Sequence, residues 1–339
     1  MAYSAVNTKL RGIYARYIKG NPQLQLLEKK DLAETVQTVE EWWALDFGDT
    51  FNLYGINRQL EKKVFDFLKS LSYYLQGDTK TFYEALLARY EIRDIKRVLR
   101  VLVHGEEIGP IRESLIALPT SYLESSDGNL TIDKFLQILE TTDYGRQLIT
   151  YVDQPKDRVL FYAEMTLDRA YYENSIKASE KLSKKDQNIV KETIGYYIDL
   201  LNLMYIYRGK NTYKILPQEM MNFLIEGGQS LSLLTLKKFI EESTAEEFLH
   251  KIRETKFGQL FSETRELGLI DIRIEQAIHT LNMKVFQESG MDIGKIITLA
   301  ILLEFCVRDI STIIEAKRLG FGPERTRTLL SVEEKEGVN

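Results

Sequence analysis

Three stretches of this chain repeat one helical pattern at intervals of 107 or 108 residues, and this repetition most constrains how the chain can fold. The stretches are Ile92–Arg100, Leu200–Arg208 and Val307–Glu315. The interval is much longer than the roughly 20–50 residues of a solenoid repeat, so it indicates triplication of a small helical domain. The repetition divides the 339 residues into three units, near 1–121, 122–233 and 234–339.

Polar residues recur at matching places in the three units. The centre of each repeated stretch carries an acid or an amide: Asp94, Asn202 and Asp309. The helix before it carries an acid: Glu61, Asp168 and Glu275. An arginine closes the first two stretches, Arg100 and Arg208, whereas Glu315 closes the third. This recurrence favours a structural role for these residues over a catalytic one.

The recurring acids and arginines predict ion pairs between the two helices of each unit. A charged group that is buried between helices needs a partner of opposite charge, since losing one partner of a buried pair costs roughly 3–5 kcal/mol. The expected pairs are Glu61 with Arg100, Asp168 with Arg208, and Glu275 with Lys317 or Arg318.

Proline is scarce, and half of the prolines follow the repeat. The chain has only six, where an average protein has about 5%. Pro110, Pro217 and Pro323 lie 107 and 106 residues apart, shortly after the three repeated stretches. Because proline breaks helix interiors, we expect each of them to end the central helix of its unit and to set the following turn.

Helical periodicity runs through the chain. Leu60, Val64, Phe67 and Leu68 fall at i, i+4, i+7 and i+8 and form one apolar stripe, and similar stripes recur in each unit. No pair of alternating β-branched runs flanks a hairpin turn. The sequence therefore predicts an all-α fold, whose three similar units can pack around a pseudo-threefold axis.

Composition and charge exclude several classes of protein. The chain carries 45 basic and 50 acidic residues, a net charge of −5, which argues against a nucleic-acid partner. Its only cysteine, Cys306, allows no intrachain disulfide. The longest strongly apolar run, Ile296–Leu303, is far shorter than the roughly 20 residues of a membrane span. We expect a cytosolic protein that reaches a membrane only through other proteins.

Motifs of catalysis and cofactor binding are incomplete. The only Glu-x-x-His, Glu247–His250, lacks the second copy that a di-iron bundle needs. The glycines of Gly290–Ile296 are too close together for a phosphate loop, and Ile296 stands where a magnesium-binding Ser or Thr belongs. Cys306 lies in an apolar helix and is expected to be a buried structural thiol. The sequence predicts no catalytic residue, cofactor or metal site.

The chain resembles the C-subunit family of V-type and A-type rotary ATPases, which corresponds to the d subunit of the eukaryotic enzyme. The resemblance spans nearly the whole length, and the segments that carry it are Tyr3–Arg11, Glu91–Arg100, Asp199–Lys210 and Val307–Gly320. One departure stands out: Glu315-Ala316 replaces the Arg-Gly found at Arg208-Gly209.

The resemblance implies a funnel-shaped protein of three helical lobes without catalytic activity. Members of that family sit at the cytoplasmic side of the membrane, on the rotor ring of proteolipid subunits, and receive the tip of the central stalk formed by the D and F subunits. The implied function is that of a rotor subunit, which passes torque between ATP turnover and ion transport. The ion site of such enzymes lies in other subunits, so H⁺ and Na⁺ both stay open, as do both directions of ATP turnover.

Two other functions fit the same residues. One is a helical adaptor or scaffold that binds other proteins outside a rotary motor. The other is an all-α enzyme with a cleft between lobes, which predicts a polar pocket with strongly perturbed carboxylates or histidines. A coupling protein of a rotary motor predicts a wide cavity without convergent catalytic groups.

Overall fold

The computed structural model describes residues 3–48, 51–124, 130–142, 145–148, 156–241, 244–261 and 267–332. Within these ranges the chain forms helices and no strand, so the predicted all-α class is confirmed. None of the described helices is both long and apolar enough to cross a membrane.

Six long helices form the frame of the molecule, as three hairpins with short turns. They are α3 (Leu53–Leu71) with α4 (Gly77–His104), α8 (Lys156–Ser179) with α9 (Lys184–Arg208), and α14 (Leu267–Glu288) with α15 (Gly294–Arg318). None of these six helices contains a proline, so no proline kinks or breaks them. Each hairpin belongs to one of the three repeated units.

Shorter helices connect and cover the hairpins. Before the first hairpin lie α1 (Ser4–Tyr17), the 3₁₀ helix η1 (Pro22–Glu28) and α2 (Leu32–Trp43). A 3₁₀ turn, η2 (Ser72–Tyr74), joins α3 to α4. Between the first two hairpins lie α5 (Ile108–Arg112), the 3₁₀ turn η3 (Thr120–Leu123), α6 (Ile132–Leu139) and α7 (Gly145–Leu148). After the second come the π-turn η5 (Gly209–Tyr213), α10 (Pro217–Met221), α11 (Leu233–Glu241), α12 (Ala245–Arg253) and α13 (Gly258–Phe261), and α16 (Pro323–Arg327) follows the third.

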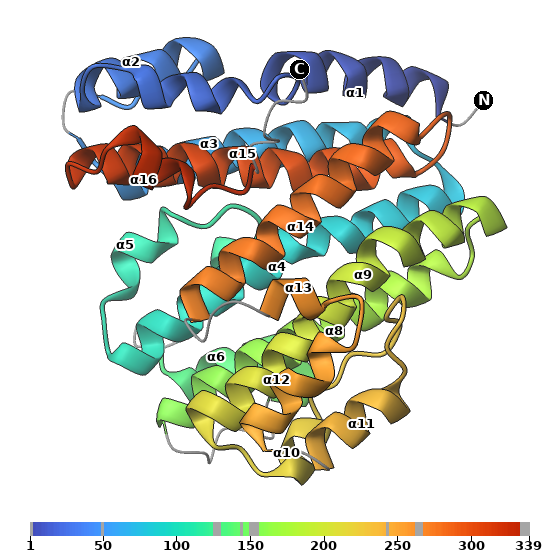
Figure 1. Cartoon of the computed structure of the whole chain (residues 1–339). Helices are drawn as coiled ribbons and strands as arrows, with labels where there is room; N and C mark the ends of the chain where they lie inside the picture. The colour runs from blue at the N-terminus through green and yellow to red at the C-terminus, as the bar shows by residue number, and fades with distance from the viewer. Residues whose placement is uncertain are drawn as a thin grey trace.

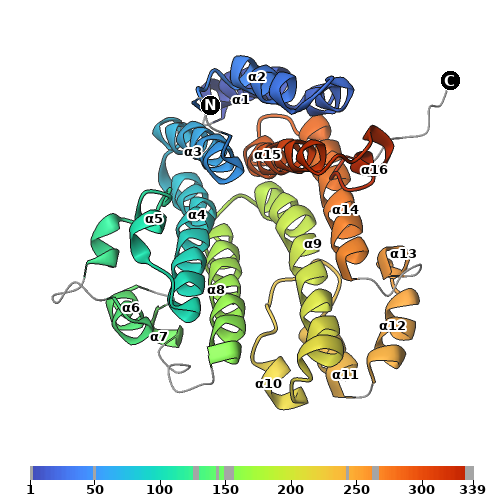
Figure 2. The same ribbon diagram turned by 90° about the vertical axis from the view of Figure 1, so that its left-hand side faces the viewer.

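The six long helices contact one another in a closed cycle. Within the hairpins, α3 contacts α4, α8 contacts α9, and α14 contacts α15. Between hairpins, α4 packs against α8, α9 against α14, and α15 returns to α3 (Figure 2). The second helix of each hairpin therefore meets the first helix of the next, and we call these three junctions seams. In Figure 1, α1 and α2 form a layer over α3 and α15, while α10, α11 and α12 lie at the opposite end.

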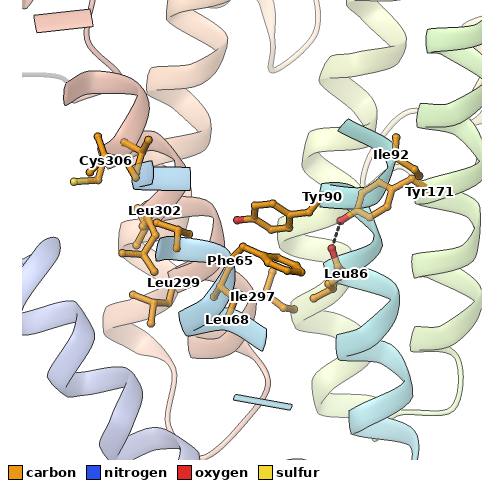
Figure 3. Packing of buried hydrophobic residues seen from close by; sticks show 14 of the residues in the cluster. Phe65, Leu68, Leu86, Tyr90, Ile92, Tyr171, Ile297, Leu299, Leu302 and Cys306 are labelled. Atoms are coloured by element: carbon orange, nitrogen blue, oxygen red, sulfur yellow. Dashed lines mark hydrogen bonds between the residues drawn. The ribbon is translucent and has the colours of Figure 1, made fainter. Parts of the chain in front are cut away.

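Apolar stripes hold this frame together, as the periodicity of the sequence predicts. Leu60, Val64 and Leu68 of α3 are completely or almost completely buried. Figure 3 shows how Phe65 of α3 and Tyr90 of α4 lie against each other, next to buried side chains of α15. The centroids of these two rings are 5.0 Å apart. The core thus fills the space between the helices of one hairpin as well as the junction where α3 and α4 meet α15 of another unit.

The phased prolines do not act as the sequence suggested. The long helices end at His104, Arg208 and Arg318, five to nine residues before the prolines. Pro217 and Pro323 are instead the first residues of the short helices α10 and α16, and Pro110 lies inside α5. Proline suits a first helical position because that residue needs no backbone N–H and its φ is already helical.

Residues with positive φ follow the second helix of each hairpin. Gly105 follows α4 with a φ of 71°, and Gly320 follows α15 with a φ of 74°. This left-handed conformation favours glycine and lets the next amides bond back to the last carbonyls of the helix. The α9 helix instead passes into the π-turn and stops at Lys214, whose φ is 50°.

A buried histidine makes the stability of the fold sensitive to acid. His279 of α14 is only 6% exposed, and its ring lies edge-on to Phe305. Burial lowers the pKa of His279 from 6.5 to about 4. Between these two pH values the unfolded chain binds a proton that the folded chain refuses, so stability falls as the pH drops.

We predict that this histidine contributes an acid-dependent loss of up to about 3 kcal/mol in the free energy of unfolding between pH 7 and pH 4. The variant His279→Gln should flatten that part of the pH dependence, measured by urea unfolding at a series of pH values. His250→Gln is the control because His250 is exposed, so its pH profile should match the wild type. A His279→Gln profile as steep as the wild-type profile would contradict the prediction.

Candidate functional site

The central polar residue of each unit binds the backbone of a segment that follows it in the chain. In the first unit, Asp94 is fully buried, and its Oδ2 accepts hydrogen bonds from three consecutive amides. The donors are the backbone N–H groups of Ile116 at 2.8 Å, Ala117 at 2.6 Å and Leu118 at 3.0 Å. Asp94 therefore fixes the segment that follows α5.

The other two units use the same device. Asn202 is fully buried, and its side chain both donates to the carbonyl of Ile225 and accepts from the amide of Ile225, each at 2.8 Å. Asp309 is fully buried as well, and accepts from the Ser331 amide at 2.9 Å and the Ser331 hydroxyl at 2.8 Å. In each unit the bound backbone lies 22 to 24 residues after the polar residue.

The acid on the preceding helix has a different partner from the predicted one. Glu61 pairs with Arg97 at 2.5 Å and with Arg93 at 3.5 Å, and Arg100 is not among its partners. Arg93 and Arg97 are one helical turn apart on α4 and so share the face that α3 meets. Arg100 lies further along the helix, beside α8. The predicted Glu61–Arg100 pair is therefore wrong.

The second and third units repeat this correction. Asp168 accepts from the Tyr205 hydroxyl at 2.7 Å and pairs with Lys96, so the predicted pair with Arg208 is wrong. Glu275 pairs with Arg308, so the predicted pair of Glu275 with Lys317 or Arg318 is wrong. Tyr205 matches Arg97 in the repeat, and Arg308 matches Arg93. The acid is thus bound about one to three turns earlier on the central helix than the sequence analysis placed it.

The arginines that close the repeated stretches reach across the seams to the next unit. Arg100 of α4 bonds to Glu164 of α8, with Nε and Nη2 at 2.8 and 2.6 Å from the same carboxylate oxygen. Arg208 of α9 donates to both carboxylate oxygens of Asp271 on α14, each at 2.8 Å. Glu164 and Asp271 are 107 residues apart, so both partners keep the phase of the repeat.

The third seam, between α15 and α3, has neither the arginine nor the acid of this pair. Glu315 stands where the arginine belongs and pairs with Arg318 on its own helix, at 2.6 Å. Asn57, 107 residues before Glu164, stands where the acid belongs, and it accepts a hydrogen bond from Ser311. The departure seen in the sequence at Glu315 is therefore matched by a departure on the facing helix.

A cavity of about 660 Å³ lies among the six long helices, and every one of them contributes to its wall. The wall carries four arginines and four acids: Arg89, Arg93, Arg208, Arg308, Glu61, Asp271, Glu275 and Glu304. Each of these acids pairs with at least one of these arginines. Because the charges balance, the wall favours neither anions nor cations as a class.

Glu304 of α15 joins two units at the cavity wall. Its Oε2 lies 2.9 Å from Arg89 and 3.3 Å from Arg93, both on α4. Tyr90 lies beside the same carboxylate, and burial, followed by the negative charge of Glu304, raises the pKa of Tyr90 well above its ordinary value. Arg89, Tyr197 and Glu304 occupy matching repeat positions, and all three line the cavity.

Tyrosines with raised pKa values also line the cavity. Burial is the largest cause of the raised pKa values of Tyr171, Tyr172 and Tyr205. The Tyr171 hydroxyl donates to the carbonyl of Leu86 at 3.3 Å, which ties α8 to α4 (Figure 3). Where the structure describes the chain, it brings together no group of three or more His, Cys, Asp or Glu side chains that could hold a metal ion.

Sequence reasoning missed the residues that join the units. Glu164, Asp271, Arg89 and Glu304 received no role, although the first two share the phase of the repeat. Extending the search for phased polar positions beyond the central stretches identifies Glu164 and Asp271. Their partners depend on which hairpins lie side by side, and periodicity along one helix does not encode that.

We predict that Asp94→Ala lowers the free energy of unfolding by about 3 kcal/mol, because three amides lose a shared charged acceptor in a buried place. Glu84→Ala on the same helix is the matched control. Glu84 is exposed and lies 3.8 Å from Lys80, so its loss should cost about 0.5 kcal/mol or less. Urea unfolding measures both values, and equal losses in the two variants would contradict the anchoring role of Asp94.

Comparison with known proteins places this arrangement in a family. Residues 6–329 match the family described as the ATP synthase (C/AC39) subunit. The chain is 20% identical to the C subunit of the A-type ATP synthase of Methanosphaera stadtmanae, over 93% of this chain and 84% of that protein. It is 23% identical to that of Methanocaldococcus jannaschii (97% and 86% covered) and 22% identical to that of Pyrococcus horikoshii (97% and 90% covered). The chain therefore belongs to the ATP synthase (C/AC39) subunit family.

Proposed function

We propose that this protein is a non-catalytic rotor subunit of a V/A-type ATPase. In this role it couples the central stalk, made of the D and F subunits, to the proteolipid ring in the membrane. It passes torque between ATP turnover and the transport of H⁺ or Na⁺, and works at the cytoplasmic side of the membrane as a peripheral part of the complex. Membership of the family supports the assignment to an ATP synthase complex.

The observation that carries the coupling role is the closed cycle of helix contacts. A part that transmits torque must resist twisting, and an open row of hairpins bends at its free ends. In this chain α15 returns to α3, so every hairpin is supported on both sides. Close-packed helices transmit strain because protein interiors are dense and nearly incompressible.

We further propose that the three hairpins and their satellite helices are three domains, at 1–121, 122–233 and 234–339, around a pseudo-threefold axis in a funnel shape. The order of contacts supports this arrangement, because the same junction between a second and a first helix occurs three times. The phased anchors Asp94, Asn202 and Asp309 support it as well, since each fixes a segment of its own unit.

The seam ion pairs are suited to fixing register more than to adding stability. Arg208 and Asp271 are 38% and 41% exposed, and a pair of this kind contributes roughly 0–1 kcal/mol. Because Nη2 of Arg208 reaches both carboxylate oxygens of Asp271, the pair nevertheless favours one register of α9 against α14. We assign Arg100 and Arg208 this positioning role in torque transmission.

A pull-down tests the proposed partners. The tagged chain, expressed in its own cells, is recovered from detergent-solubilised membranes and the bound proteins are identified. We expect the proteolipid together with the D and F subunits of the stalk. Recovery of other proteins with neither the ring nor the stalk would favour the helical adaptor and contradict the rotor role.

Removing the seam pairs should impair coupling while ATP hydrolysis continues. We predict that the double variant Arg100→Ala/Arg208→Ala, assembled in the whole ATPase, transports fewer ions per ATP hydrolysed, because the hairpins can shift under torque. Ion uptake and ATP hydrolysis are measured in parallel on the same vesicles.

The control for that experiment is Arg318→Ala. This arginine has a similar exposure to Arg100, and its carboxylate partner Glu315 lies on the same helix. Its loss removes an arginine pair without touching a seam, so the ratio of ions to ATP should stay at the wild-type value. Equal ratios in the wild type and the double variant would contradict the role of the seam pairs.

A further inference from the structure

The three seams are not held in the same way. Arg100–Glu164 and Arg208–Asp271 join the first two seams at matching positions. At the α15–α3 seam, Glu315 turns to its own helix and Asn57 bonds to Ser311. At this position the α15–α3 seam therefore lacks the arginine–carboxylate pair that the other two seams have, and the charged link between the third and first units is made instead by Glu304 of α15 with Arg89 and Arg93 of α4.

A segment that precedes the first hairpin crosses this same seam. It consists of α1, η1 and the residues between them, 4–28, and we call it the strap. The strap packs against α15 through both α1 and η1. In Figures 1 and 2, α1 lies over α3 and α15. The α1 helix also reaches α3 directly, where the Lys9 ammonium donates to the Ser70 hydroxyl at 2.9 Å.

One strap residue contacts both helices of the seam. Tyr17 is 2% exposed, and its ring lies 5.7 Å, centroid to centroid, from Phe67 of α3. Its backbone carbonyl accepts a bond of 3.5 Å from the thiol of Cys306 on α15. The lone cysteine of the chain thus lies under the strap, where burial raises the pKa of its thiol well above the ordinary value.

Lys317 fastens the far end of the strap to α15. Its ammonium donates to the Leu27 carbonyl at 3.2 Å and to the Lys29 carbonyl, at the C-terminal end of η1. A cation is favourable there because the last carbonyls of a helix have no partner within the helix. Gln23 of η1 also donates to Asp309 at 3.4 Å, so the strap meets the anchor residue of the third unit.

We propose that the strap is a lock on the α15–α3 seam, that it replaces the missing ion pair, and that Lys317 is its fastening residue. When Lys317 releases η1, the α15–α3 seam alone is loosened, because the other two seams keep their own arginine pairs. The pairs of Glu304 with Arg89 and Arg93 still join the third unit to the first, so α3 and α15 loosen against each other without separating. The proposal concerns the isolated chain and does not depend on the rotor function.

Hydrogen exchange of the full-length protein tests the lock. The variant Lys317→Met keeps an apolar side chain of similar length but loses the ammonium group. In this variant the backbone amides of α3 and α15 near the seam should exchange roughly tenfold faster than in the wild type, because one charge-assisted hydrogen bond is lost. Amides of α9 and α14 should exchange at the wild-type rate. Arg208→Ala should give the opposite result, with faster exchange in α9 and α14 only. Exchange that rises equally at both seams in Lys317→Met, or at neither, would overturn the proposal.

A rescue variant tests the replacement directly. Asn57→Asp/Glu315→Arg installs at the third seam the charges that the other seams carry, and Ser311 can still donate to the new carboxylate. Added to Lys317→Met, this pair should restore slow exchange in α3 and α15. In the wild-type background it should slow that exchange further, which keeps the test decisive even if Lys317→Met does not fold. Failure to slow exchange in the wild-type background would show that the strap does not stand in for the ion pair.

Discussion

The contact between α15 and α3 is the interaction on which the rest of the structure depends. Three consecutive helical hairpins can form an open row, and the two end hairpins then lack support on one side. The return of α15 to α3 removes both free ends at once and encloses the cavity among all six helices. The phased anchors then hold the connecting segments against this frame.

Charge on the cavity wall follows from the same closure. Charged side chains on one face of a helix are usually solvated, but here helices on all sides bring opposite charges within reach. Glu304 receives two arginines from another unit, and Glu61 receives two from its own hairpin. Removing Glu304 leaves Arg89 without its counter-charge in a partly enclosed place, which is a larger loss than the pair contributes when intact.

Much of the fold could be predicted from the sequence, because helical periodicity and the 107-residue phase are local or additive signals. They give the all-α class and the equivalence of Asp94, Asn202 and Asp309.

The pairing of Glu61, Asp168 and Glu275 could not be predicted, since it depends on the axial offset between two helices. An offset of one turn moves the partner from Arg100 to Arg97. The arginines at 100 and 208 were paired within a unit, whereas the fold uses them between units. The phased prolines were assigned to the ends of the central helices, but Gly105, Lys214 and Gly320, all of positive φ, come before them.

The most direct test of the account is an electron cryomicroscopy structure of the detergent-solubilised ATPase that contains this chain. The account predicts density for a closed six-helix ring, with α15 against α3, lying on the rotor axis between the proteolipid ring and the central stalk. Density for the chain outside that axis, or a chain whose α15 and α3 are apart in the assembled complex, would contradict it.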